Sequence, residues 1–154
     1  MTVTSVSGTT FLADTSILLR DKLLNNINDP IATIRTGNEK FIMTEYPQRA
    51  VKYPIITIVD RGISQPQRLG MSSEGTVMDI TMEIRIWARN VVERDKLFDE
   101  VYNYLKNNQL DSLTGLVASN LNGFKLNSAI NINEPGEAGI KSKVIEVNFM
   151  FINE

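Results

Sequence analysis

Residues 78–86 read Met-Asp-Ile-Thr-Met-Glu-Ile-Arg-Ile, and this stretch decides the fold. Apolar and polar side chains alternate along it with a period of two, which predicts a β-strand. One face of such a strand packs on a core, and the other meets water or a partner. A strand of this kind belongs to an antiparallel or mixed sheet that helices cover on one side. The apolar face carries Met78, Ile80, Met82, Ile84 and Ile86.

A helix is predicted directly after this strand. It begins at Asn90, with Glu93 three residues later in a capping-box arrangement. Its polar side is rich in Glu, Lys, Asp and Asn, so we expect that side to face solvent. The buried stripe consists of Leu97, Phe98, Val101, Tyr104 and Leu105.

An earlier helix is predicted from about Asp14 or Thr15 to Ile27. Asp14 is a suitable N-cap, and Pro30 disfavours helix at the residue before it. The expected apolar side is Ile17, Leu19, Leu23, Leu24 and Ile27. A third, short helix is plausible from Ser112 to Leu121, with Gly123 stopping it.

Further strands are expected on both sides of the central helix. The stretch 53–59 predicts a strand with Pro54 near its start, and an apolar run at 31–34 is a possible strand beginning. Polar, irregular loops are expected at 36–52 and 60–75. Near the end of the chain, alternating segments at 124–132 and 145–151 predict two strands joined by a long hairpin connection, residues 133–143.

The order of these elements predicts an α+β fold: a mixed, mostly antiparallel sheet with two or three helices packed on one face. With 154 residues, the chain has the length of one domain. We expect a flexible N-terminal arm at residues 1–10 and a single domain at residues 11–154. The arm has no basic cluster, and no apolar run approaches the roughly 20 residues of a membrane span, so we expect no targeting peptide and no membrane contact.

Histidine and cysteine are both absent, and this excludes several classes of site. Without them there is no Ser-His-Asp triad, no Cys-His dyad, no disulfide and no ordinary zinc site. The net charge of -2 gives no sign of a dedicated nucleic-acid binder. We therefore interpret the chain as a non-enzymatic protein that needs no cofactor and no metal.

Carboxylates are the remaining candidates for acid–base chemistry. Asp95, Asp99 and Glu100 have helical spacing, but they fall on the predicted solvent side of the helix. Carboxylates there lack the burial that catalytic carboxylates need. The glycines of residues 134–139 do not form a phosphate loop, because the segment carries two glutamates and leads into a strand. A small carboxylate-dependent, metal-binding enzyme stays open as an alternative from another class.

Candidate interface residues gather around the two long loops. Basic side chains there suit an acidic partner surface or scattered solubilising charge, and a loop methionine is an adaptable contact. Trp87 lies on the polar face of its strand, where an exposed indole favours an interface. The full candidate set is Arg49, Lys52, Tyr53, Arg61, Gln65, Arg68, Met71, Trp87, Glu134 and Lys141.

These elements together resemble a known family. The N-terminal helix, the segment 53–58 (Tyr-Pro-Ile-Ile-Thr-Ile), the long polar loop, the strand ending in Ile86-Trp87-Ala88 and the helix segment 97–105 look like the tail terminator and tail-completion, or head–tail joining, proteins of tailed bacteriophages and related viruses. The similarity covers most of the chain in element order, whereas the matching motifs are short.

The resemblance implies a virion structural protein of the tail or neck, made in the host cytoplasm. It implies a homo-oligomeric ring, generally a hexamer, that caps the tail tube and joins it to the head connector or adaptor protein. DNA would meet such a ring only in transient passage through its lumen. A head-completion or neck adaptor protein is the nearest alternative, and an oligomeric scaffold of a tail-like cellular machine is another.

Overall fold

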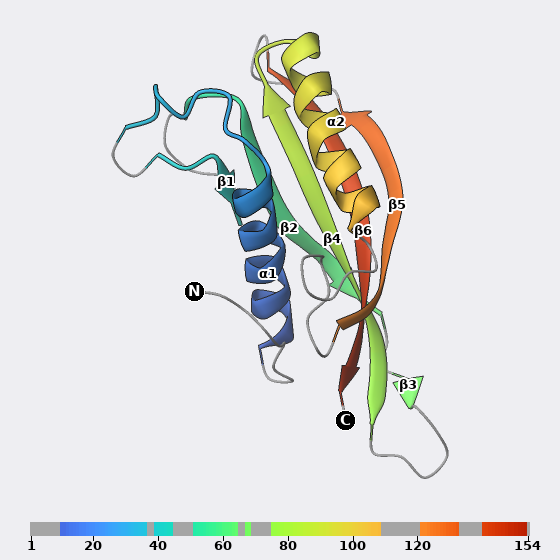
Figure 1. Ribbon diagram of the computed structural model, residues 1–154. Helices are drawn as coiled ribbons and strands as arrows, with labels where there is room; N and C mark the ends of the chain where they lie inside the picture. The colour runs from blue at the N-terminus through green and yellow to red at the C-terminus, as the bar shows by residue number, and fades with distance from the viewer. Residues whose placement is uncertain are drawn as a thin grey trace.

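In the part of the chain that the structure describes, two helices lie on the same face of one mixed β-sheet (Figure 1). This computed structural model describes residues 10–36, 39–44, 51–64, 67–68, 75–108, 121–132 and 140–153. The elements are α1 (Phe11–Asn26), β1 (Ile42–Met43), β2 (Ile55–Ile63), β3 (Gln67–Arg68), β4 (Thr76–Ala88), α2 (Val91–Asn107), β5 (Leu121–Ile132) and β6 (Lys141–Asn153).

The sheet has the strand order β1-β2-β4-β6-β5, and β3 pairs with β4 outside this path. All pairs are antiparallel except β1 with β2, which is parallel. The prediction of an α+β fold with a mixed, mostly antiparallel sheet is therefore confirmed. β4 lies at the centre because it pairs along its full length with β6 and along most of it with β2.

The core lies between the sheet and the two helices. The alternation that predicted β4 is confirmed: Ile80, Met82, Ile84 and Ile86 are all fully buried. The register continues the apolar face onto both neighbouring strands, since Ile84 pairs with Ile58 of β2 and Ile145 of β6. From α2, the buried side chains are Leu97, Val101 and Leu105, as the predicted stripe requires. Phe98 and Tyr104 pack against the core at its margin.

Helix α2 begins where the sequence indicates. Asn90 is its N-cap, and the Asn90 side-chain oxygen accepts a hydrogen bond from the Glu93 backbone N–H at 2.8 Å. Glu93 in turn forms an ion pair with Arg89 at 3.1 Å. These contacts satisfy a backbone donor that a helix start otherwise leaves without a partner.

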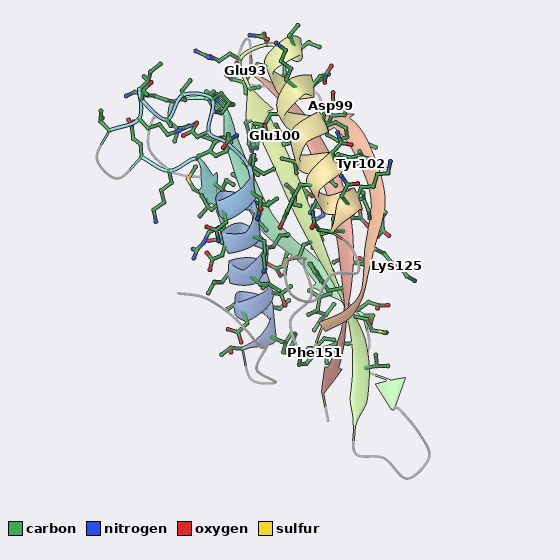
Figure 2. The ribbon with its side chains drawn as sticks, viewed as in Figure 1. Glu93, Asp99, Glu100, Tyr102, Lys125 and Phe151 are labelled. Carbon is green, nitrogen blue, oxygen red and sulfur yellow. The ribbon has the colours of Figure 1, made fainter. Side chains whose placement is uncertain are left out.

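Helix α1 starts earlier than predicted, at Phe11, so the proposed capping role of Asp14 is wrong. Thr10 occupies the N-cap position, and its hydroxyl donates to the Asp14 carboxylate at 2.9 Å. The extra turn is stabilised by tertiary contact, because the Phe11 ring stacks on Phe151 of β6 with centroids 5.5 Å apart (Phe151 is labelled in Figure 2). Leu24, expected on the buried side, is 46% exposed.

The segment after α1 forms a turn at the residues where the sequence suggested the start of a strand. Residues 31–34 form a turn in which the Ile31 carbonyl accepts hydrogen bonds from the backbone N–H groups of Ile34 and Arg35. The Asp29 carboxylate accepts from the Ile31 N–H at 3.0 Å and fixes the start of this turn. The short strand β1 then lies inside the region expected to be irregular, and the Tyr53-Pro54 peptide bond before β2 is cis.

Three strands extend into regions predicted as loop or helix, and β3 lies wholly within the loop predicted at residues 60–75. β6 begins at Lys141, inside the connection predicted at residues 133–143, because it pairs with the end of β4. β2 continues to Ile63 because a bulge at Asp60 to Gly62 lets it stay paired with β4; Gly62 adopts φ 140, which suits glycine. β5 begins at Leu121 and contains Gly123, so neither residue ends a helix there. The rest of the predicted short helix, residues 112–120, lies outside the described residues. Residues 1–9 of the predicted N-terminal arm also lie outside them, and Thr10, its last residue, is the N-cap of α1.

Candidate functional site

The predicted interface residues are spread over both ends of the sheet. Lys52 and Tyr53 precede β2, and Arg61 lies in the β2 bulge. Trp87 is the residue before the last of β4, and Lys141 begins β6. Arg68 belongs to β3, where the backbone alone is described. Arg49, Gln65, Met71 and Glu134 lie outside the described residues. The register places Lys52, Tyr53, Trp87 and Lys141 toward one end of the sheet and Arg68 toward the other. The described members therefore form no single site, and three of them, Lys52, Arg61 and Trp87, belong to local clusters.

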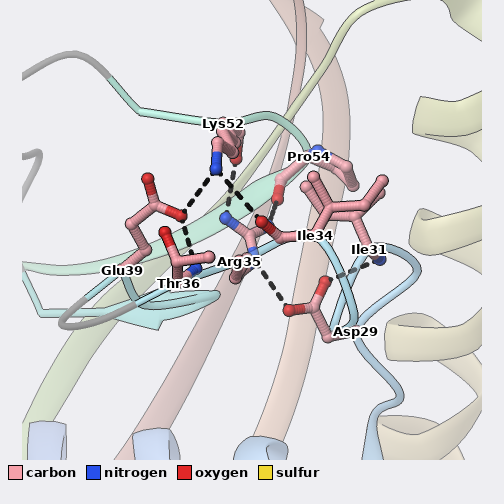
Figure 3. A network of polar contacts seen from close by, with 8 residues as sticks. All are labelled: Asp29, Ile31, Ile34, Arg35, Thr36, Glu39, Lys52 and Pro54. Carbon is pink, nitrogen blue, oxygen red and sulfur yellow. Dashed lines mark hydrogen bonds and ion pairs between the residues drawn. The ribbon is translucent and has the colours of Figure 1, made fainter.

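The most densely bonded of these clusters is centred on Arg35, at the entrance to β2 (Figure 3). The Arg35 side chain is only 6% exposed. Its Nε lies 2.6 Å from Asp29 Oδ2, and its two terminal nitrogens donate to the backbone carbonyls of Lys52 and Pro54. The guanidinium also lies over the Phe41 ring, 5.5 Å from its centroid. One side chain thus ties the turn after α1 to the segments that precede β1 and β2.

Lys52 extends this cluster to the surface, as Figure 3 shows. Its ammonium group lies 3.2 Å from Glu39 and donates to the Ile34 carbonyl at 3.1 Å. Glu39 also accepts a hydrogen bond from the Thr36 backbone N–H at 2.9 Å. This bond, followed by the one from Lys52, lowers the pKa of the Glu39 carboxyl below its usual value. Lys52, a predicted contact residue, is already engaged within its own chain.

A second charged cluster lies on the sheet face opposite the helices. Glu83 is the central group, with a side chain only 8% exposed. Arg61 Nε is 3.0 Å from one carboxylate oxygen, and Arg85 contacts the other at 2.8 Å. Two guanidinium groups thus neutralise the one carboxylate, so Glu83 serves to hold two arginines on this face. A buried carboxylate held in this way has its charge compensated by its partners.

Trp87 lies on this same face, as the alternation predicted, and it is half-buried rather than fully exposed. Its indole N–H donates to the Thr57 hydroxyl at 3.0 Å, and the Arg85 guanidinium lies 5.2 Å from a ring centroid. Part of the indole surface is thus used inside the chain. Ile55, the residue that pairs with Trp87, is fully buried on the same face.

The carboxylates of α2 have structural partners. Asp95 contacts Arg94 at 3.0 Å and Lys143 at 3.8 Å. Glu100 accepts a hydrogen bond from the Asn28 backbone N–H at 3.1 Å, which fastens the end of α1 to α2. Asp99 is exposed, and Figure 2 places it with Glu100 and Tyr102 along α2. Asp99 and Glu100 are exposed, as the prediction of a solvent-facing side requires, whereas Asp95 is half-buried beside Lys143 of β6.

A groove of about 600 Å³ lies between α1 and the strand β1. Its lining combines apolar surface with two basic side chains and one acidic side chain. The residues that line it are Arg20, Leu24, Glu39, Lys40, Phe41, Ile42, Met43 and Thr44. The groove adjoins an edge of the sheet, since β1 is an outermost strand in the strand order.

Within the described ranges, no group of three or more Asp or Glu side chains is placed to hold a metal ion. In the same ranges, no helix is both long enough and apolar enough to cross a membrane. The chemistry that the described charged clusters display is ion pairing and hydrogen bonding to backbone, which positions segments for contact.

Arg35 and Glu83 are the two organising residues that sequence reasoning missed. A signal existed for Glu83, because it stands two residues from Arg85 on the same strand face. Arg35 follows a turn in a region without periodicity, and its partners are the carbonyls of distant residues. No pattern in the sequence predicts such contacts.

Comparison with known proteins adds no relative: the sequence matches no family model, and it matches no curated protein.

Proposed function

We propose that this chain is a tail terminator, a virion structural protein that forms a homo-oligomeric ring. The ring caps the tail tube, stops its growth and presents a surface to the head connector. DNA passes through its lumen without being held. The proposal starts from the resemblance in element order. It places the protein at the tail or neck of the virion.

The observation that carries the proposal is that both edges of the sheet are left uncovered by other described strands. At one edge, β1 pairs with only Ile56 and Thr57 of the longer β2. At the other edge, β5 has 12 residues and pairs with β6 on one side. Within the described residues no further strand covers either edge. Long edge strands promote pairing with other chains unless they are covered, and a ring of copies covers them.

The side-chain inventory supports the same function. Histidine and cysteine are absent from the sequence, and the charged clusters at Arg35 and Glu83 are satisfied inside the chain. Loops held on a rigid scaffold suit recognition of protein partners. A net charge of -2 suits a channel wall that DNA passes without adhering.

The function is tested by the length of tail tubes. The tail tube protein encoded with this chain is polymerised alone and with the purified protein, and tube lengths are measured by electron microscopy. We expect short tubes with a ring at one end. Tubes of unchanged length, with the protein absent from their ends, would contradict the proposal. Binding to the head connector without binding to tubes would instead identify a neck adaptor.

A further inference from the structure

The polar contacts around Arg35 fall into an inner part and an outer part that differ in exposure (Figure 3). In the inner part, the Arg35 side chain binds the Asp29 carboxylate and the backbone carbonyls of residues 52 and 54. The two charged side chains of this part are only 6% and 16% exposed. In the outer part, the Lys52 ammonium group contacts Glu39, and these side chains are 43% and 33% exposed. Water therefore competes for the outer contacts far more than for the inner ones.

Lys52 belongs to both parts through different atoms. Its carbonyl accepts a hydrogen bond from Arg35 at 2.7 Å, which holds its backbone in the inner part. Its ammonium group donates to the Ile34 carbonyl at 3.1 Å and lies 3.2 Å from Glu39. Because a flexible four-carbon stem carries the ammonium group, this group can leave both partners by rotation within its own side chain. The backbone of residue 52 need not move.

The turn that contains Ile34 is held without the ammonium group. The N–H groups of Ile34 and Arg35 donate to the Ile31 carbonyl at 2.9 Å and 3.1 Å. The Ile31 N–H donates to the Asp29 carboxylate at 3.0 Å, and that carboxylate is bonded to Arg35. Ile34 is also 56% exposed, so water replaces the bond that its carbonyl loses. The inner part therefore keeps the turn in place when Lys52 has left.

One carboxylate oxygen, Glu39 Oε2, takes part in two bonds of the outer part. It lies 3.2 Å from the Lys52 ammonium group, and it accepts a hydrogen bond from the Thr36 N–H at 2.9 Å. Lys52 thus restricts the position of the oxygen that protects the Thr36 N–H. When the ammonium group leaves, the Glu39 side chain gains rotational freedom, and water reaches the Thr36 N–H more often.

We propose that the outer part of the Arg35 cluster opens by itself in the folded chain, while the inner part keeps the segment before β2 bonded. The open state releases the ammonium group of Lys52 and the carboxylate of Glu39, which also lines the groove beside β1. Lys52 is one of the predicted interface residues, so opening makes its charge available for contact at no cost to the inner part. The inference concerns the chain by itself and does not depend on the proposed function.

Amide hydrogen exchange of the full-length chain, measured by NMR, tests this inference. The Thr36 N–H reports on the outer part, and the Ile31 N–H reports on the inner part. The N–H of Ile84, a fully buried residue of the central strand β4, reports on unfolding of the sheet. After correction for intrinsic rates, we expect Thr36 to exchange at least about tenfold faster than Ile31, because small local openings expose it. Equal protection of Thr36 and Ile31 would overturn the inference.

Lys52→Gln removes the ammonium group and keeps a polar side chain. We expect it to accelerate exchange at Thr36 by about threefold to fivefold, which is the effect of losing an exposed ion pair near the upper end of the usual range. Exchange at Ile31 and Ile84 should stay unchanged. The matched control is Lys96→Gln, an exposed lysine on α2, which should change none of the three rates.

The pattern of acceleration decides the outcome. Acceleration in Lys52→Gln that is confined to Thr36 supports the inference. Acceleration that extends equally to Ile31 or Ile84 would show that the cluster opens only as one unit or with the sheet, and it would overturn the inference. Unchanged exchange at Thr36 would also overturn it, because Lys52 would then not hold Glu39 in place. Arg35→Lys is the positive control for the inner part and should accelerate exchange at both Thr36 and Ile31.

Discussion

Replacing Arg35 with Ala should be among the most destabilising polar substitutions in the chain. The change removes an ion pair with Asp29 at 2.6 Å and a hydrogen bond to the Lys52 carbonyl at 2.7 Å. It also removes a hydrogen bond to the Pro54 carbonyl and the contact with the Phe41 ring. Because the Arg35 side chain is only 6% exposed, water replaces the lost partners only in part, chiefly at the exposed Lys52 carbonyl.

The magnitude follows from what the substitution leaves behind. Removing one partner of a buried ion pair costs about 3–5 kcal/mol. Asp29 keeps its hydrogen bond from the Ile31 N–H and is 16% exposed, which places the expected loss near the lower end, at about 3 kcal/mol. Arg35→Lys keeps the charge without the planar fork, so about 1.5–2 kcal/mol should be lost. A loss of 3 kcal/mol lowers Tm by about 6–12 °C in a domain of this size.

Urea unfolding followed by circular dichroism measures these losses as a change in midpoint at constant slope. Lys96→Ala is the surface control and should stay within about 0.5 kcal/mol of the wild type. If Arg35→Ala also unfolded within about 0.5 kcal/mol of the wild type, the Arg35 cluster would contribute nothing net to stability. The account of how the segment before β2 is held would then be wrong.

Three other predictions concern packing and titration. Leu19→Ala, at a fully buried position of α1, should cost about 3 kcal/mol in urea unfolding, whereas Leu24→Ala should cost less than about 1 kcal/mol. Hydrogen bonds from the Thr36 backbone N–H and the Lys52 ammonium group lower the pKa of Glu39. The contribution of Glu39 to stability is therefore present above its ordinary pKa and is lost as pH falls through its lowered pKa in the folded protein. Glu39→Gln should therefore flatten the acid branch of the stability curve, and an unchanged curve would contradict this. Burial raises the pKa of Tyr104, so its contribution to stability is present below its ordinary pKa and is lost as pH rises through the raised value. Tyr104→Phe should remove from an absorbance titration one phenolate transition that lies above the ordinary pKa of tyrosine.

The elements with strong periodicity were predictable from the sequence. The apolar alternation of β4 and the stripe of α2 each report burial on one side, and the Asn90 cap is a local interaction between residues close in sequence. The bounds of α1 were less predictable, because its first turn is held by the contact of Phe11 with Phe151, which lies far along the chain. Tertiary packing thus extended α1 by one turn beyond the start that the local sequence pattern predicts.

The clusters that organise the surface were largely unpredictable. Arg35 bonds to carbonyls of Lys52 and Pro54, and any residue can supply a carbonyl, so the sequence carries no mark of the pairing. The position of Trp87 opposite the core face followed from alternation, but its hydrogen bond to Thr57 depends on the register between β2 and β4. Register between strands is fixed by the whole sheet rather than by either strand.

The most direct test of assembly is an electron micrograph of the purified chain, alone and after mixing with tail tubes. Averaged end-on views should show closed rings with one fixed number of subunits, in solution or at tube ends. Particles that stay monomeric in both samples, even at high protein concentration, would contradict assembly through the edges of the sheet.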